Sequence, residues 1–374
     1  MRKWLILFSC FMVNIACSDT FDQQLLMAMK AYKTPVIGYA IIDRYRVVRV
    51  ETLSIDPTIQ VSTNTLFQAA SISKSMTAYA ILKLIDENHL TLDVPANHYL
   101  QHWKIPDNLF TKNHPVIIRQ LMDMTSGLSV SGFAGYEQST NLPTQLELLK
   151  GESPANNAPV RVFYTPGSRY FYSGGAFQVL QQVIESITNI DFSTYMNTHV
   201  LPIIGMKHSI YQYLLVDAAF KKLVAPGFTG WDGSKITGGW HNYACAGAGG
   251  LWSTPSDLAI FILNISASYL GKENAYLSKA MAQQMLTRQK NTDYGLGVVV
   301  MGQGKNMYFM KDGHNYGYHS QIIMFPNQGK GIAIMTNSET GDSMINYAIA
   351  LVAQQYQWPY YFPFFDELVK MPAF

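Results

Sequence analysis

The amino-acid sequence predicts one α+β unit, in which an antiparallel sheet is flanked by helices and a second lobe is mostly helical. Three observations predict it: strand patterns lie near both ends of the chain, the long helical patterns lie mainly between them, and no linker divides the parts. Strands from both ends can therefore join in one sheet, which the first and last helices cover. The middle of the chain is left to form the helical lobe.

The first part of the chain predicts a helix, two strands and a longer helix. Residues 21–33 have amphipathic helical spacing, and Val36–Ile42 and Arg46–Leu53 predict two strands joined by a turn. A longer helix is predicted from near Ser71 to about Asn88, because its apolar residues keep helical spacing.

The middle of the chain predicts mainly helices and turns. Residues 95–160 are rich in Pro and turn formers and hold only short helical stretches such as Ile117–Met124. A helix over Ala176–Ile187 has its apolar residues on one face, and Gly-rich turns dominate residues 227–250. Another helix, about Pro255–Ile265, begins with a Pro that suits a first helical turn.

The last part of the chain predicts an antiparallel meander, because short turns with Gly or Asn separate four strand patterns. The expected strands are Gly295–Met301, Met307–Lys311, Tyr318–Phe325 and Gly331–Thr336. A last helix, roughly Met344–Gln355, closes the unit.

Composition and charge suit a globular enzyme. Of the 374 residues, 48% are hydrophobic and 14% charged, which is enough apolar material for a sizeable core. The formal net charge is +2, and the chain has no basic stripe or run of Lys and Arg. We therefore expect no nucleic-acid partner.

The beginning of the chain predicts a secretory signal peptide over residues 1–18. Two basic residues precede the apolar run Trp4–Val13, and small residues follow it. Cleavage after Ser18 would leave residues 19–374 as one exported domain, periplasmic or secreted. The alternative is a lipoprotein that is anchored through Cys17. No second long apolar run follows, so we expect no integral membrane span after cleavage.

The pattern Ser71-Ile72-Ser73-Lys74 is the only S-x-x-K in the chain and the first candidate for catalysis. Residues three apart on a helix share a face, so Lys74 can hydrogen-bond the Ser71 hydroxyl and accept its proton. The N-terminus of the helix also favours developing negative charge. The structural alternative is a Ser that caps the helix and a Lys in its first turn.

Two further patterns indicate catalysis more strongly together with Ser71-Ile72-Ser73-Lys74 than either does alone. Tyr172-Ser173-Gly174 precedes a predicted helix, and a Tyr that faces a Ser–Lys pair can act as a phenolate base or proton relay. Lys311-Asp312-Gly313 ends a predicted strand, and Gly313 would let an acyl group or substrate backbone approach closely. Alone, the first pattern could be a Tyr packed under a loop and the second a simple turn.

The sequence predicts no metal site and no cofactor. It lacks HExxH, CxxC, a P-loop and GxSxG, and its nine His residues show no metal-ligand spacing.

Together and in this order, the three patterns resemble the signatures of the serine beta-lactamase and penicillin-binding protein superfamily. The similarity is greatest to class C beta-lactamases and their related D-alanyl-D-alanine carboxypeptidases, D-aminopeptidases and esterases. It extends over nearly the whole mature chain, including Thr125–Leu128, Gly249–Thr254 and Tyr294–Gly297. The resemblance implies the beta-lactamase-like (DD-peptidase) fold.

The resemblance also implies a role for each site residue. Ser71 would be the acylated nucleophile, Lys74 its proton acceptor, and Tyr172 a group that assists proton transfer. Lys311 would keep the site positive, and the N–H groups of Ser71 and His314 would form an oxyanion hole. The expected substrate is a small molecule or derives from the cell wall, and the oligomeric state stays open.

Two departures from the family's pattern narrow the substrate. The middle motif usually ends in Asn, so Gly174 removes an amide that would bond a substrate carbonyl. The third motif usually has Thr or Ser where Asp312 stands, and a carboxylate there would repel a substrate anion unless it pairs with Lys311 or turns away. We therefore expect an esterase or peptidase for uncharged or amine-bearing ends, ahead of a true beta-lactamase. The alternative function is a catalytically silent module that binds penicillin or cell-wall peptide.

Overall fold

The structure is a computed structural model, and it describes residues 21–214, 218–229, 232–290 and 292–359. The predicted signal peptide, with Cys17 and the cleavage point after Ser18, lies outside the described residues. In the described part of the chain, no helix is long and apolar enough to cross a membrane.

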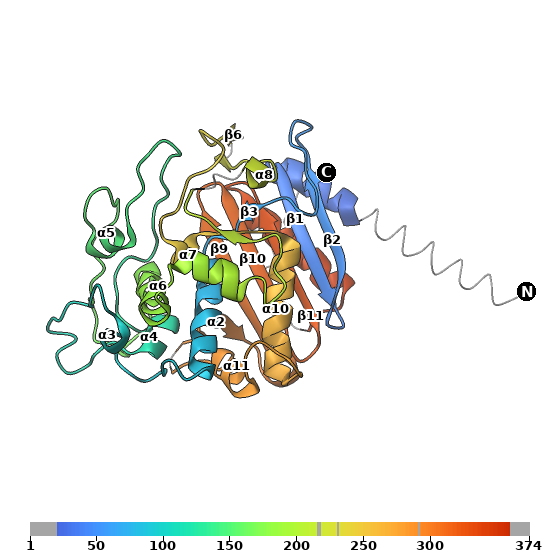
Figure 1. Cartoon of the computed structure of the whole chain (residues 1–374). Coiled ribbons are helices and arrows are strands. Elements are labelled where there is room, and N and C mark those ends of the chain that lie inside the picture. The colour runs from blue at the N-terminus through green and yellow to red at the C-terminus, as the bar shows by residue number, and fades with distance from the viewer. Residues whose placement is uncertain (1–20, 215–217, 230–231, 291, 360–374) are drawn as a thin grey trace, which may run out of the picture.

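A six-stranded antiparallel sheet joins the two ends of the chain, in the strand order β2-β1-β11-β10-β9-β8 (Figure 1). Strand β1 pairs with β11, so that Ile37 lies opposite Thr336. The prediction of one sheet built from both chain ends is therefore confirmed. The strands are β1 (Val36–Asp43), β2 (Arg46–Ser54), β8 (Val299–Met301), β9 (Tyr308–Asn315), β10 (Tyr318–Phe325) and β11 (Lys330–Thr336).

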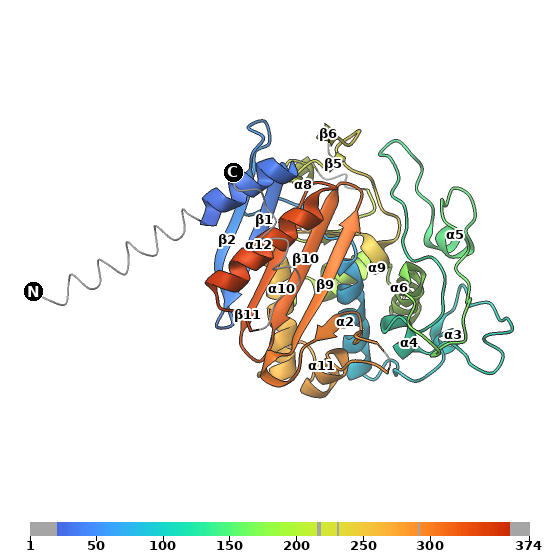
Figure 2. The ribbon, with the colours of Figure 1, turned by 180° about the vertical axis from the view of Figure 1, so that it is seen from behind.

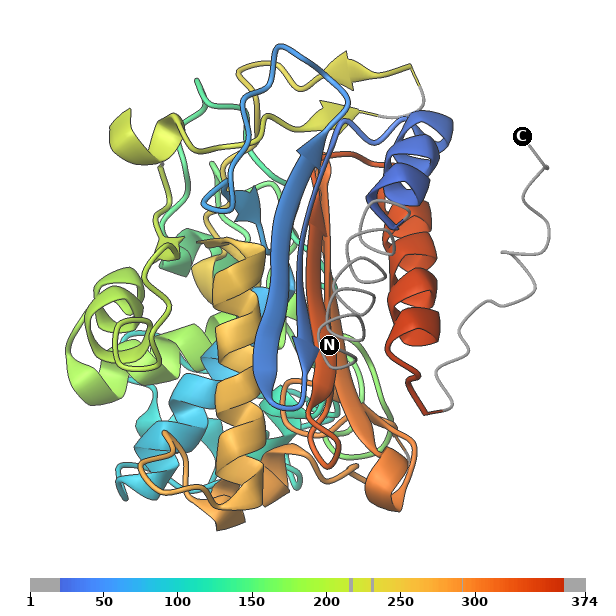
Figure 3. The ribbon, with the colours of Figure 1, turned by 90° about the vertical axis from the view of Figure 1, so that its right-hand side faces the viewer.

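Helices cover both faces of this sheet. The helix over residues 21–32 and α12 (Gly341–Gln355) lie on one face, whereas α2 (Ile72–Asp86) and α10 (Pro255–Leu270) lie on the other (Figures 2 and 3). The first face buries an apolar cluster of its own, which contains Ile323. The prediction that the first and last helices cover the sheet is confirmed.

The middle of the chain forms the helical lobe, whose longest helix is α6 (Gly174–Thr188). This helix packs against α2 and α9 (Ala246–Gly249), which brings the lobe to the start of α2. The shorter helices are α3 (Ala96–Tyr99), α4 (Ile118–Met122), α5 (Gln145–Lys150), α7 (Phe192–Tyr195), α8 (Ala218–Lys221) and α11 (Lys279–Met285). Two small sheets pair β3 (Phe67–Gln68), β7 (Leu251–Ser253) and β4 (Ile210–Tyr211), and β5 (Phe228–Thr229) with β6 (Ser234–Lys235).

Two boundaries are wrong in the prediction for local reasons. Helix α10 continues beyond Ile265 to Leu270, where Gly271 takes a left-handed φ of 69° and ends it. Strand β8 starts at Val299 and not at Gly295, because Gly297 has a φ of 83°, which is outside the extended range.

A third difference matters for the site. Strand β9 continues past Lys311 to Asn315, because β10 pairs with it up to the turn between the two strands. The predicted motif Lys311-Asp312-Gly313 therefore lies inside a strand and does not end one.

We predict that Ile323→Ala destabilises the protein by about 2–5 kcal/mol, because it removes a fully buried side chain between the sheet and α12. Val48→Ala, on an edge strand and half exposed, is the matched control and should cost less than about 1 kcal/mol. Urea unfolding measures both. Equal shifts in the two variants would contradict this view of the core.

Candidate active site

Ser71 and Lys74 meet at the start of α2. Lys74 Nζ donates a hydrogen bond to Ser71 Oγ at 2.9 Å and another to the carbonyl oxygen of Ala248 at 2.7 Å. Ser71 directly precedes α2, but its hydroxyl makes no capping hydrogen bond to the helix. The interpretation of Ser71 as a simple helix cap is therefore wrong, since its hydroxyl lies against Lys74.

The lysine of this pair is almost completely buried, with 3% of Lys74 exposed. Burying a charged group costs free energy unless hydrogen bonds replace its lost water, and the two acceptors do so here. The turn into α2 is strained as well, because Ala70 has a φ of 48°, a left-handed value that residues with a Cβ rarely adopt. Strain of this kind clusters at functional sites.

Tyr172 lies between two lysines, two residues before the start of α6. The Nζ atoms of Lys74 and Lys311 are each 5.3 Å from the centroid of its ring. Burial raises the pKa of Tyr172, but the two lysine charges and a hydrogen bond with Ser71 outweigh it and lower the pKa to about 8. A phenol with this pKa can exchange protons near neutral pH.

Lys311 supplies a second buried positive charge. Its side chain is 0% exposed, and its Nζ donates to the carbonyl oxygen of Asp312 at 2.7 Å. Burial lowers the pKa of Lys311, but the facing groups of Tyr294, Tyr172 and Asp312 raise it well above the ordinary value. Lys311 therefore stays charged and keeps the site positive.

Gly313 brings strand β9 against the start of α2. A Cβ atom built on Gly313 would lie 2.3 Å from the carbonyl oxygen of Ala69 and 3.0 Å from the amide nitrogen of Ser71. This approach is open because β8 pairs with β9 only as far as Met310. The next residue, His314, follows on the same free edge.

The middle motif divides into a Tyr at the site and a Ser that supports the fold. Ser173 caps α6 by accepting a hydrogen bond from the amide of Ala176 at 3.0 Å. A Cβ atom built on Gly174 would lie 3.2 Å from the Phe133 ring and 3.2 Å from the carbonyl oxygen of Ser131. An Asn at position 174 would therefore press against Phe133.

Asp312 meets both conditions that weaken repulsion of a substrate anion. Its Oδ1 is 3.3 Å from Lys311 Nζ, and its side chain is 69% exposed. Lys311 and Gly313, on either side of it in the strand, are buried on the opposite face. The Lys311 charge also holds the pKa of the Asp312 carboxyl below its ordinary value.

A pocket of about 580 Å³ opens beside His314 and Asn315. Ser71, Lys74 and Tyr172 do not line this pocket, so it adjoins the serine and does not contain it. Its wall mixes aromatic and apolar side chains with charged ones: Phe133, Ile236, Tyr243, Tyr316, Glu137, Lys235, His241 and Glu339.

Sequence analysis missed four groups that complete the site. The carbonyl of Ala248 accepts from Lys74, and Asn315 Nδ2 donates to Gln68 Oε1 at 2.8 Å and to the carbonyl of Gly249 at 3.1 Å. These bonds tie β9 to β3 and α9. Gln68 carried a signal, because it is the polar residue in the apolar run before Ser71, but its partner could not be read from the sequence.

The sheet with helices on both faces, and the buried Ser–Lys pair beside a Tyr, define the class of penicillin-binding proteins and serine beta-lactamases. The chain belongs to the Beta-lactamase family, whose model matches residues 21–357. The family prediction made from the three motifs is therefore confirmed.

Two curated relatives share part of the chain. Protein flp from Staphylococcus aureus (strain MW2) is 27% identical over 158 residues, which cover 42% of this chain and 30% of that protein. A "Putative D-alanyl-D-alanine carboxypeptidase" from Salmonella heidelberg (strain SL476) is 23% identical over 271 residues, 65% of this chain and 61% of that protein. The matched region thus spans less than two thirds of each relative.

Solved structures show the same fold. The octameric penicillin-binding protein homologue from Pyrococcus abyssi has a TM-score of 0.72 at 23% identity, covering 89% of this chain and 77% of that one. D-alanine carboxypeptidase AmpC from Burkholderia cenocepacia has a TM-score of 0.71 at 18% identity, covering 91% and 99%. The predicted beta-lactamase-like fold is confirmed.

We predict that Gly313→Ala slows covalent labelling by a fluorophosphonate at least about 100-fold, because the new methyl group would push β9 away from the Ser71 amide. Gly132→Ala is the matched control, since a Cβ there meets nothing within 4 Å. The melting temperature of each variant checks that the fold survives. Equal labelling rates would contradict a role for the close approach.

We predict that the labelling rate of wild type rises with pH through about 8, since the base form of Tyr172 accumulates above its lowered pKa. In Tyr172→Phe this rise should disappear and the rate should fall about 100-fold or more. Tyr170→Phe is the control, because burial raises the pKa of that neighbouring Tyr instead. An unchanged pH profile in Tyr172→Phe would show that Tyr172 is not the titrating group.

Proposed function

We propose that the protein is an exported serine hydrolase that works through an acyl-enzyme on Ser71. The observation that carries the proposal is the 2.9 Å contact between Lys74 Nζ and Ser71 Oγ, to which the lowered pKa of Tyr172 adds a second proton-transfer group. Export rests on the predicted signal peptide alone.

The arrangement suits acyl transfer in two steps. In the first, Ser71 Oγ bonds to the substrate's carbonyl carbon and passes its proton to Lys74, while Lys74 gives one of its own protons to the Tyr172 phenolate and so stays charged. Tyr172 passes a proton to the leaving group, whose bond to the carbonyl carbon then breaks. In the second step the Tyr172 phenolate takes a proton from water, whose oxygen bonds to the carbonyl carbon of the ester. That proton returns through Lys74 to Ser71 Oγ as the bond between Ser71 and the acyl group breaks, which releases the acid product.

The transition state of either step puts negative charge on the carbonyl oxygen. Gly313 lies beside the amide nitrogen of Ser71, and His314 follows Gly313 in β9, which supports the N–H groups of Ser71 and His314 as the proposed oxyanion hole. Loss of one such donor typically costs about 2.7–4 kcal/mol of barrier. The positive charge of Lys311 stabilises this oxyanion further.

The proposed substrate is a small ester or a peptide with a D-amino acid, whose acyl part enters the pocket beside His314 and Asn315. The Phe133 ring next to Gly174 favours an apolar acyl group over one that needs an amide partner. Because Asp312 is paired and turned outward, it repels anionic substrates less than the sequence alone indicates. The family usually has the hydroxyl of Thr or Ser where Asp312 stands. The loss of this hydroxyl is the main reason why we rank penicillins below esters and peptides as substrates.

Labelling separates the hydrolase from a catalytically silent binding module. A fluorophosphonate and a fluorescent penicillin are each incubated with wild type, Ser71→Ala and, as control, Ser131→Ala, which alters an exposed serine near the site. We expect the fluorophosphonate to label wild type and the control but not Ser71→Ala. No adduct with either reagent in wild type would favour the silent module.

We predict that Asp312→Thr raises the rate of penicillin acylation relative to p-nitrophenyl ester hydrolysis by about tenfold, or about 1.4 kcal/mol. The substitution removes a carboxylate and supplies the hydroxyl that is usual in the family. Asp293→Thr is the matched control, because Asp293 is also exposed and ion-paired, with Arg288. A ratio that stays constant in both variants would show that Asp312 does not set substrate preference.

A further inference from the structure

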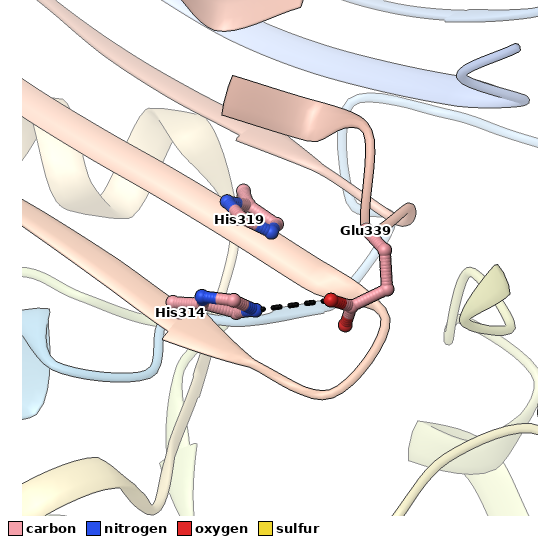
Figure 4. A group of neighbouring side chains, drawn as sticks. All are labelled: His314, His319 and Glu339. Carbon is pink, nitrogen blue, oxygen red and sulfur yellow. Dashed lines mark hydrogen bonds and ion pairs between the residues drawn. The ribbon is translucent and has the colours of Figure 1, made fainter. Parts of the chain in front are cut away.

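Two histidines and a glutamate form a cluster on the face of the sheet that α12 covers, beside the start of that helix. His314 on β9 lies opposite His319 on β10, and the centroids of their rings are 3.9 Å apart. His314 Nε2 is 3.2 Å from Glu339 Oε2. One possible ligand atom from each of the three residues lies within 4.8 Å of the other two (Figure 4).

His319 has a buried ring nitrogen without a partner. Its side chain is 3% exposed, and its Nε2 makes no hydrogen bond with any of the described residues. Its Nδ1 lies 2.5 Å from Asp342 Oδ1. A neutral His that donates its Nδ1–H to a carboxylate presents a lone pair on Nε2, and this pairing is typical of metal-ligating histidines.

The backbone fixes the carboxylates of the cluster. A Cβ atom built on Gly341 would lie 2.8 Å from His319 Cβ, so only a Gly lets the start of α12 come this close and brings Asp342 within reach. Glu339 is held from the other side, because its Oε1 accepts a hydrogen bond from the amide of Gly317 in the β9–β10 turn. The other carboxylate oxygen of Glu339, Oε2, therefore faces His314.

Ion pairing alone leaves part of the cluster unexplained. Pairs of His314 with Glu339 and of His319 with Asp342 satisfy one nitrogen of each ring. They give no reason for the unpartnered Nε2 of His319, and an unsatisfied buried polar atom of this kind usually marks a strained or functional position.

We propose that His314, His319 and Glu339 bind one divalent transition-metal ion such as Zn²⁺, with Asp342 orienting His319. Two nitrogens and a carboxylate oxygen are a common zinc ligand set, and a water would complete the tetrahedron. The ligand atoms of a tetrahedral zinc site lie about 3.4 Å from one another. The candidate ligand atoms here lie up to 4.8 Å apart, so they must move closer together when zinc binds. The side chains of His314, 57% exposed, and Glu339, 24% exposed, have room to do so.

The ion would join the β9–β10 hairpin to the start of α12. The hairpin also carries Gly313 against Ser71, so bound metal would stiffen the edge of the proposed oxyanion hole. His314 and Glu339 also line the pocket proposed for the acyl part, but no ligand side chain exchanges a proton or forms a bond in the proposed acyl transfer, so zinc binding is tested separately from hydrolase activity.

Calorimetric titration of the purified full chain with ZnCl₂ tests the proposal. We expect one equivalent of Zn²⁺ per chain in wild type, and at least about tenfold weaker binding in His314→Gln and in Glu339→Gln. Asp342→Asn should weaken binding about 10–100-fold, which is typical for the partner of a ligating His. Saturation at about 100 times Kd should raise the melting temperature of wild type by about 4 °C.

His89→Gln is the matched control, because His89 also lies near a glutamate, Glu87 at 3.9 Å, but is not part of a three-residue ligand cluster among the described residues. Its zinc binding should equal that of wild type. If wild type binds no zinc up to 100 times the protein concentration, or if His314→Gln and Glu339→Gln both bind as wild type does, the proposal is overturned. The cluster is then a pair of ion pairs.

Discussion

The buried ammonium group of Lys74 is the constraint on which the rest of the site depends. A charge this far from water needs hydrogen-bond acceptors, and Lys74 finds them in Ser71 and in the carbonyl of Ala248. Ala248 can serve only if α9 lies against α2. Thr77 Oγ1 on α2 donates to the carbonyl of Gly247, and Gln181 Oε1 on α6 accepts from the Gly247 amide, so polar bonds hold the three helices together.

The site lies where the helical lobe meets the sheet, and both parts contribute residues to it. The sheet contributes Lys311 and Gly313 from β9, the helical lobe contributes Tyr172, and the start of α2 holds the Ser–Lys pair between them. The lowered pKa of Tyr172 needs lysines from both sides. Because the sheet contains strands from both ends of the chain, the site is complete only when the whole unit has folded.

The sequence predicted well what depends on local pattern. Helix α2 and the strands of the sheet fall near their expected ranges, and the S-x-x-K spacing places Ser71 and Lys74 in contact because a helix puts residues three apart on one face. Prediction failed where distant contacts decide. Strand β9 continues to Asn315 only because β10 pairs with it, and the Ala248 carbonyl reaches Lys74 only through the packing of α9.

The histidine cluster shows the same limit. His314 and His319 match no standard metal-binding spacing, but the β9–β10 hairpin sets them opposite each other, and Glu339 joins them from the segment before α12. Residues directly opposite in an antiparallel pair have their side chains close together, a relation that depends on strand register and not on sequence spacing.

The most direct test of the central claim is time-resolved intact mass after mixing the protein with a p-nitrophenyl ester, followed by peptide mapping. We predict a transient gain in mass equal to that of the acyl group, located on the peptide that contains Ser71. This adduct decays as product forms and is absent in Ser71→Ala. Product formation without an adduct in wild type, or an adduct on another residue, would contradict this claim.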